Sequence, residues 1–177
     1  PVLDLSVFTY QGYRVGVMCL MLNFGITLAA MYVLPQFYQN AMLIAVAAAG
    51  VLMLPGGLIN AAVSVAAGTL FDRFGARGPV SIGFACSALA SAMLMIATPE
   101  TPIWYMVACH IIMMIGVPLA MSPCQTHALA SIPPQLNSDG STIMNTLQQV
   151  LGAICTAVAT CLLATGQNTY FAAGGTD

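Results

Sequence analysis

The sequence predicts an all-α membrane protein, a polytopic bundle of about five transmembrane helices. Hydrophobic residues make up 59% of the 177 residues, charged residues make up 5%, and the mean hydropathy is +0.91. Soluble domains carry about 25% charged residues, so three basic and five acidic side chains cannot coat the surface of one. The apolar residues also gather into long segments. Lipid is therefore the expected environment for most of the surface.

Five of these segments are long enough to span a bilayer, which takes about 20 predominantly apolar residues. They are 15–38, 44–71, 79–97, 102–124 and 140–165. Together they define a membrane bundle over 15–165, with a lead-in at 1–14 and a polar, glycine-rich tail at 166–177. The chain begins at Pro1 and not at an initiator Met, and we expect it to be a fragment.

The segment boundaries fall at charged residues, prolines and glycines. Arg14 precedes the first segment, and a charged turn at 72–78 separates the second from the third. Residues 99–102 separate the third from the fourth, and a polar stretch at 133–140 precedes the fifth. No Asp, Glu, Lys or Arg lies in the interior of a segment, because a charge facing lipid is costly.

Prolines within two segments predict kinks. Pro55 is followed by two glycines in the second segment, and Pro118 and Pro123 lie in the fourth. A proline inside a helix removes one backbone hydrogen bond and bends the helix. In a transporter, such bends shape a cavity or permit one group of helices to rock against another. In a static bundle they have no function and are merely tolerated. The sequence leaves both interpretations open.

The basic residues predict the orientation. Arg14, Arg73 and Arg77 are the only ones, and all three lie on one side of the membrane if the five segments alternate. Basic residues favour the cytoplasmic side. We therefore expect a cytoplasmic amino end, an external tail at 166–177, and a multi-pass protein of the plasma membrane.

Small residues recur at four-residue spacing within three segments and predict close helix crossings. They are Gly83, Ser87 and Ser91 in the third segment, Gly116 and Ala120 in the fourth, and Gly152, Thr156 and Thr160 in the fifth. The six cysteines all lie in or beside apolar segments without a Cys-x-x-Cys pair. We expect small buried hydrophobic residues there, and no disulfide, resident metal or cofactor.

Polar side chains within the segments are candidates for lining a transport pathway. We assign this role to Asn23, Asn60 and Gln149, with hydrogen bonding between helices as the alternative. For Ser64 and Asn145 we favour hydrogen bonding between helices.

His110 is the one ionisable side chain that we place inside a segment, and we add it to the cavity-lining candidates. It either relays a proton or is neutral and hydrogen-bonded to a neighbouring helix. Met106 and Met114 lie four residues to either side, and thioether and imidazole ligands suit Cu(I). The simpler explanation is that twelve methionines in an apolar chain produce such spacing by chance.

The segment 68–78 is a charged, glycine-containing turn between two long apolar segments. Its distinctive residues are Gly68, Asp72, Arg73, Gly75 and Arg77. They resemble the Gly-x-x-x-Asp-Arg-x-Gly-x-Arg loop signature of the major facilitator superfamily. Stretches at 3–8, 52–57 and 145–149 extend the resemblance to the fourteen-span drug:proton antiporter branch, over nearly the whole chain. Relatives commonly carry a basic residue within 145–149, where this chain has Gln148.

The resemblance implies that the chain holds five of the six helices of a carboxyl-terminal half. The amino-terminal half and the final helix of the same transporter are then expected partners. In the family the charged loop is a conformational latch between the halves; the alternative is that its charges only set the topology. Because the helix dipole opposes a carboxylate at its carboxyl end, Asp72 should have a basic neighbour, Arg73 or Arg77, or the amino end of another helix. Gly75 is expected to supply the turn and Gly68 a close crossing.

The function implied by the resemblance is secondary active transport, namely proton-coupled efflux of drugs or other amphipathic small molecules by alternating access. The alternatives are a transporter of one specific metabolite on the same scaffold and a non-transporting, truncated membrane fragment. The sequence contains no phosphate-binding Walker motif and no recognisable catalytic cluster, so no enzyme is expected. It also lacks a block of charge that would bind nucleic acid.

Overall fold

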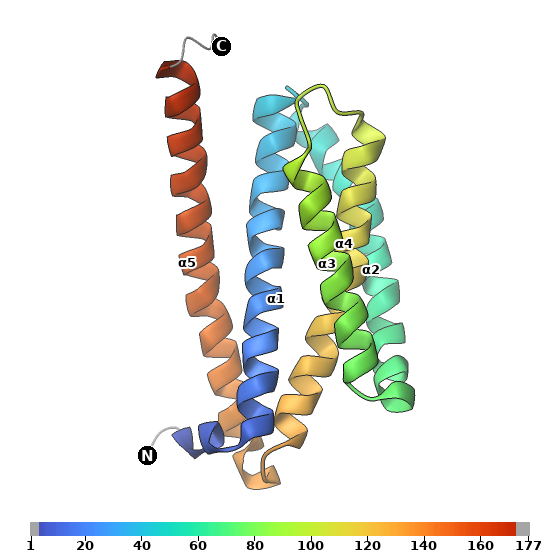
Figure 1. Cartoon of the computed structure of the whole chain (residues 1–177), viewed down its shortest axis with the longest axis vertical. Coiled ribbons are helices and arrows are strands. Elements are labelled where there is room, and N and C mark those ends of the chain that lie inside the picture. The colour runs from blue at the N-terminus through green and yellow to red at the C-terminus, as the bar shows by residue number, and fades with distance from the viewer. Residues whose placement is uncertain (1–3, 173–177) are drawn as a thin grey trace.

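The computed structural model describes residues 4–172, which form five long helices without a β-strand (Figure 1). The helices are α1 (Gln11–Gln36), α2 (Val46–Phe74), α3 (Arg77–Met95), α4 (Ile103–Ala130) and α5 (Asn137–Ala172). Each is long and apolar enough to cross a membrane. The predicted all-α bundle of five transmembrane helices is confirmed.

Three short helical segments accompany them: η1 (Leu5–Thr9), η2 (Phe37–Ala41) and η3 (Pro134–Leu136). η2 is a π-helix that follows Pro35 at the end of α1. Because proline has no N–H to donate, the regular hydrogen-bond pattern changes there. The Asp4 carboxylate accepts a hydrogen bond of 2.9 Å from the Ser6 N–H at the start of η1. Hydrogen bonds from the Ser6 side chain and backbone lower the pKa of Asp4.

α5 is longer than the predicted segment. We expected a polar tail from residue 166, but residues 166–172 continue the helix; the remainder of the tail, 173–177, lies outside the described residues. The hydroxyls of Thr165 and Thr169 each donate to the carbonyl four residues earlier, at 2.8 Å. With no proline or charged residue in this stretch, nothing ends the helix where the hydropathy falls.

α4 is the central helix, and α1, α2 and α3 all pack against it. α5 packs mainly against α1 and stands at the edge of the bundle (Figure 1). α1 and α5 both begin at the lower end in Figure 1, where the turn between α2 and α3 also lies. The first turn of α1 and the α2–α3 turn, which carry the three arginines, therefore share one end of the bundle.

The close crossing predicted from small residues is found between α3 and α4. A Cβ added at Gly83 would lie 2.7 Å from the Gly116 carbonyl oxygen and 2.6 Å from the Ala120 nitrogen. At Gly116 it would lie 2.6 Å from the Gly83 carbonyl oxygen. These separations are below van der Waals contact, so the two backbones touch and any side chain at either glycine would push them apart.

Candidate functional site

The turn between α2 and α3 is closed by Gly75. Its φ of +69° lies in the region that glycine adopts readily, and its N–H donates to the Phe71 carbonyl at 2.8 Å. Only Gly75 and Ala76 separate the two helices. The predicted role of Gly75 in the turn is confirmed.

The charged side chains of this turn point away from the bundle. Asp72, Arg73 and Arg77 are exposed, and within residues 4–172 no ion pair joins Asp72 to either arginine. The predicted pairing of Asp72 with Arg73 or Arg77 is therefore wrong, whereas the alternative, the amino end of another helix, stays a prediction. Consecutive residues of a helix do not face each other, which separates Asp72 from Arg73.

Gly68, one helical turn before Asp72, was expected to permit a close crossing. Nothing in the described part of the chain lies within 4 Å of a Cβ added there. Gly68 is exposed on α2, so it makes no crossing with α1, α3, α4 or α5.

Two of the predicted cavity-lining residues form hydrogen bonds between helices. Asn23 on α1 is fully buried, and its side-chain N–H donates to the Ser87 hydroxyl on α3 at 3.3 Å. Its amide oxygen is buried without a hydrogen-bond partner. Asn60 on α2 donates to the Met114 carbonyl on α4 at 3.2 Å. Both residues therefore join helices in this structure.

The two residues favoured for hydrogen bonding between helices do not form such bonds here. Ser64 is exposed and donates to the Asn60 carbonyl of its own helix at 2.7 Å, as helical serines commonly do. Asn145 is exposed on α5, and its side chain has no hydrogen bond to another described residue. Residue type alone predicted a partner for each, but the rotational position of each side chain decided otherwise.

His110 is buried at the contact between α4 and α2, with 3% of its surface exposed. Gly56 on α2 makes room for it, because a Cβ at Gly56 would clash with Nδ1 and Cε1 of the imidazole. Neither ring nitrogen has a hydrogen-bond partner in the described residues. The expected hydrogen bond to a neighbouring helix is therefore wrong.

The methionines beside His110 do not gather into one site. Met106 packs in a cluster with Leu34 and Tyr38, whereas Met114 belongs to a different cluster, with Ala90 and Val117. Among residues 4–172, no three His, Cys, Asp or Glu side chains lie close enough to hold a metal ion. The copper hypothesis gains no support from this arrangement.

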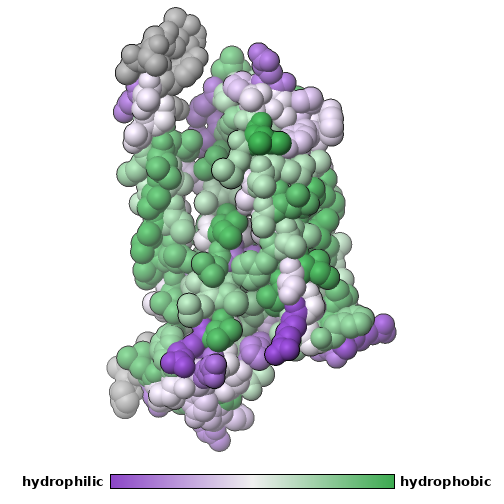
Figure 2. Space-filling view, viewed as in Figure 1, coloured by the Kyte–Doolittle hydropathy of each residue, from purple (hydrophilic) through white to green (hydrophobic). Residues whose placement is uncertain are grey.

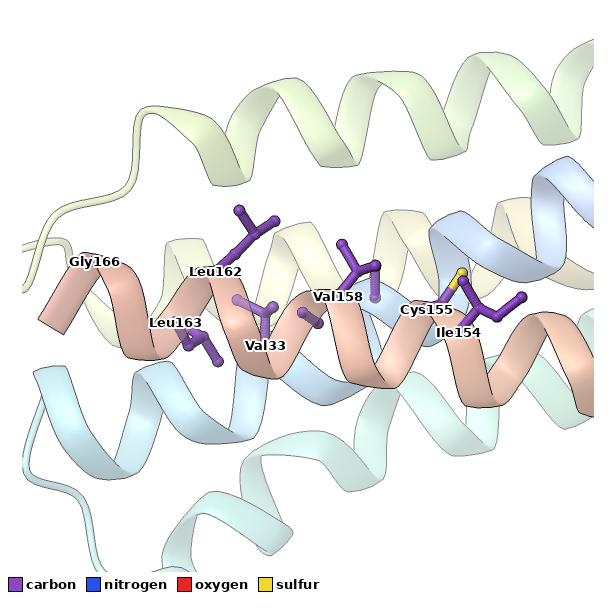
Figure 3. A pocket seen from close by; sticks show the side chains of 9 residues that line it. Val33, Ile154, Cys155, Val158, Leu162, Leu163 and Gly166 are labelled. Atoms are coloured by element: carbon purple, nitrogen blue, oxygen red, sulfur yellow. The ribbon is translucent and has the colours of Figure 1, made fainter. Parts of the chain in front are cut away.

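An apolar groove of about 500 Å³ lies between α1 and α5 (Figure 3). Its lining residues are Ala29, Val33, Ile154, Cys155, Val158, Ala159, Leu162, Leu163 and Gly166. None of the candidate site residues is among them. The sequence offered no signal for this groove, because the side chains that line it are of the same kind as those that face lipid.

Gln149, the remaining cavity-lining candidate, is exposed on α5. It lines neither the groove beside α5 nor a second cavity of about 90 Å³ between α1, α3 and α4. The side chain therefore faces outward from the five-helix bundle.

The surface of the bundle identifies a class of protein. Figure 2 shows a broad hydrophobic zone across the long helices, with hydrophilic residues gathered towards the two ends. These features define a polytopic membrane protein: a hydrophobic zone of this kind, five helices of membrane-spanning length, and a charged turn at one end.

Comparison with known proteins defines the family. The model of the Major Facilitator Superfamily matches residues 2–156. The chain therefore belongs to the Major Facilitator Superfamily, and the predicted family is confirmed. This is a family of transporters and not of enzymes, in agreement with the expectation from the sequence.

Individual relatives are similar over almost the whole chain. It is 39% identical over 170 residues to the lincomycin resistance protein LmrB of Listeria innocua and, equally, to that of Listeria monocytogenes. It is 34% identical to LmrB of Bacillus subtilis. Each alignment covers 96% of this chain but 36% of the relative, so the chain spans about a third of these proteins' length. No solved structure matches the chain significantly.

Proposed function

We propose that this chain is part of the carboxyl-terminal half of a secondary active exporter that moves amphipathic drugs, among them lincomycin, out of the cell. The observation that carries the proposal is the 39% identity to lincomycin resistance proteins over 96% of the chain. The apolar interior, with few polar groups, suits amphipathic substrates better than sugars, which need many fixed hydrogen-bond partners. Efflux is coupled to protons and proceeds by alternating access.

The proposal includes a latch at the α2–α3 turn. Asp72, Arg73 and Arg77 are exposed and unpaired within the described residues, and Gly68 has open space beside it. These features support contacts with the amino-terminal half of the same transporter. The apolar groove beside α5 similarly supports a final helix packed against α1 and α5.

The orientation belongs to the same proposal. The start of α1 and the α2–α3 turn share one end of the bundle, and together they carry every arginine of the chain. Basic residues favour the cytoplasmic side. We therefore place the amino end in the cytoplasm of a cell whose plasma membrane holds the transporter.

The deciding experiment is drug accumulation in energised cells that express the full-length parent protein. Lincomycin and ethidium are measured with and without a protonophore, in wild type and in Asp72→Asn. We expect low accumulation in wild type, a rise with the protonophore, and a rise in the variant because the latch is lost. Equal accumulation in cells with and without the protein, with its presence in the membrane shown, would overturn drug efflux. Transport of one metabolite alone would instead favour a specific transporter.

A further inference from the structure

α5 carries two exposed stripes of opposite character. The apolar stripe consists of Val150, Ile154, Val158 and Leu162. The polar stripe consists of Thr142, Asn145, Gln149, Thr156 and Thr160, all exposed. At about 100° per residue, the five polar residues fall within about 60° of one another around the helix. A single helix thus presents two chemically different surfaces outside the bundle.

Contacts with α1 fix the depth of the polar stripe. The Tyr13 hydroxyl donates to the Gly140 carbonyl at 2.7 Å, and the Thr160 hydroxyl bonds the Tyr32 hydroxyl at 3.0 Å. These pairs are separated by 127 and 128 residues, so α5 runs parallel to α1 with a nearly constant offset. Gln149 is then level with about residue 21 of α1, which is well inside the first membrane-spanning segment.

The polar stripe borders the side of α5 that packs on α1, because Thr160 bonds Tyr32, but Asn145 and Gln149 are exposed. A Cβ at Gly25 of α1 would lie 3.4 Å from the Cys155 sulfur and 3.7 Å from Leu151, and a Cβ at Gly152 of α5 would lie 3.2 Å from Leu28 of α1. Leu151, Gly152 and Cys155 therefore mark the side of α5 that packs. Gln149 is rotated by about 160° from Leu151 and about 120° from Cys155, but by only about 60° from Gly152, at 100° per residue. Its side chain is exposed, so its amide lies outside the contact with α1.

The two side-chain amides of the stripe lack hydrogen-bond partners among the described residues. The Thr142 and Thr160 hydroxyls donate to carbonyls one turn earlier, at 2.9 Å and 2.8 Å. The side-chain amides of Asn145 and Gln149 form no hydrogen bond with any residue in 4–172. Amide groups left against lipid are costly, and polar residues at membrane depth face the protein interior or a water-filled cavity.

We infer that the polar stripe of α5 lines the transport pathway and binds the uncharged, hydroxyl- and amide-bearing part of the transported molecule. This inference rests on the proposed export function. From 140 to 172 the sequence has no Asp, Glu, Lys or Arg, so the stripe offers donors and acceptors without charge. From Thr142 to Thr160 it extends about 27 Å, close to the ~30 Å thickness of the hydrocarbon core. That length fits a path across the membrane better than one local pocket.

Cysteine labelling tests whether the stripe faces water. Asn145→Cys and Gln149→Cys are made in the full-length parent protein, with Val158→Cys on the apolar stripe as the matched control. The wild type, which has six cysteines of its own in this chain, gives the background. We expect a charged methanethiosulfonate reagent to modify both polar-stripe variants at least tenfold faster than Val158→Cys. Equal rates would show that a helix of the same transporter, or lipid, covers the stripe, and would overturn the inference.

A binding readout tests the class of substrate. Chloramphenicol is uncharged and carries two hydroxyls and an amide, whereas ethidium is a permanent cation. We expect chloramphenicol to slow modification of Gln149→Cys and ethidium to slow it less. If Gln149→Cys is labelled rapidly but chloramphenicol does not slow the labelling, the stripe faces water but does not bind this neutral compound. That result would overturn the assigned class of substrate. Protection reports binding of the compound and does not require transport. A lack of protection can therefore be told apart from a lack of drug efflux.

Transport by isosteric variants completes the test. Gln149→Met and Asn145→Leu keep the side-chain size but remove the hydrogen bonds, and Ile154→Leu serves as the control. We expect chloramphenicol efflux to fall about fivefold for each lost hydrogen bond, with ethidium efflux changed less than twofold. An equal loss for both compounds would indicate a structural role, and no loss for either would exclude binding by these amides.

Discussion

α4 and α5 differ in burial far more than in composition. Both are apolar enough to span a membrane, yet 56% of the most apolar window of α4 is buried in the bundle, against 6% for α5. α4 packs against three helices through glycines and small side chains, whereas α5 packs against α1 alone for most of its length. Among the described residues, α4 is therefore largely buried, whereas α5 keeps most of its surface exposed.

The largest expected effect comes from adding a methyl group where backbones touch. Gly116→Ala in the full-length parent protein should lower the free energy of unfolding by about 2 kcal/mol, because the Gly83 carbonyl occupies the space. Gly152→Ala on α5 is the control, since its nearest neighbour, at 3.2 Å, is the flexible end of Leu28. Thermal unfolding in detergent measures both. Equal destabilisation would show that α5 is packed as tightly as α4.

The second effect concerns the two stripes of α5. Val158→Asn places an amide in the apolar groove beside α1 and should destabilise the protein by about 1.5 kcal/mol. Gln149→Met should leave stability within about 0.5 kcal/mol, as a surface exchange does. The yield of folded protein and its apparent melting temperature report both changes. If Gln149→Met proves the more destabilising variant, the polar stripe is a packing surface.

A smaller effect is expected at the hydrogen bond between α1 and α3. Asn23 and Ser87 are both buried, and their side chains are joined at 3.3 Å. A double-mutant cycle with Asn23→Leu and Ser87→Ala should give a coupling of about 0.6 kcal/mol, the usual value within a membrane. The cycle is measured by thermal unfolding. A coupling near zero would mean that the bond contributes nothing to holding α3 in place.

The smallest effect is expected at His110. Its ring nitrogens have no partner in the described residues, so His110→Leu removes no hydrogen bond. Efflux and its sensitivity to a protonophore should change less than twofold in cells expressing the full-length variant. Loss of the protonophore effect in His110→Leu, with normal amounts of protein, would establish His110 as a proton relay.

The sequence predicted the number and order of the helices, but not the rotation of each helix about its axis. The five segments follow from hydropathy, and the α3–α4 crossing follows from Gly83 and Gly116, because small residues let two helix backbones approach closely. The same spacing at Gly152, Thr156 and Thr160 does not give such a crossing, since both threonines are exposed. Ser64 bonds its own helix and His110 has no partner. Both outcomes depend on the rotation of a helix about its axis. The sequence does not reveal that rotation, because a helix face that packs on an apolar neighbour has the same composition as one that faces lipid.

The outline of α5 was missed for a related reason. Hydropathy falls after residue 165, yet the helix continues to Ala172 because each backbone group still finds its partner one turn away. Likewise the stripe at Asn145 and Gln149 was present in the sequence, but only the contacts of Tyr13 and Tyr32 with α5 fix its depth.

The two-residue connection at Gly75 and Ala76 has a consequence for how α2 and α3 cross the bilayer. Two residues reach about 7 Å, so the end of α2 and the start of α3 cannot occupy opposite sides of a core about 30 Å thick. The two helices therefore form one helical hairpin in the bilayer, with its turn on a single side of the membrane.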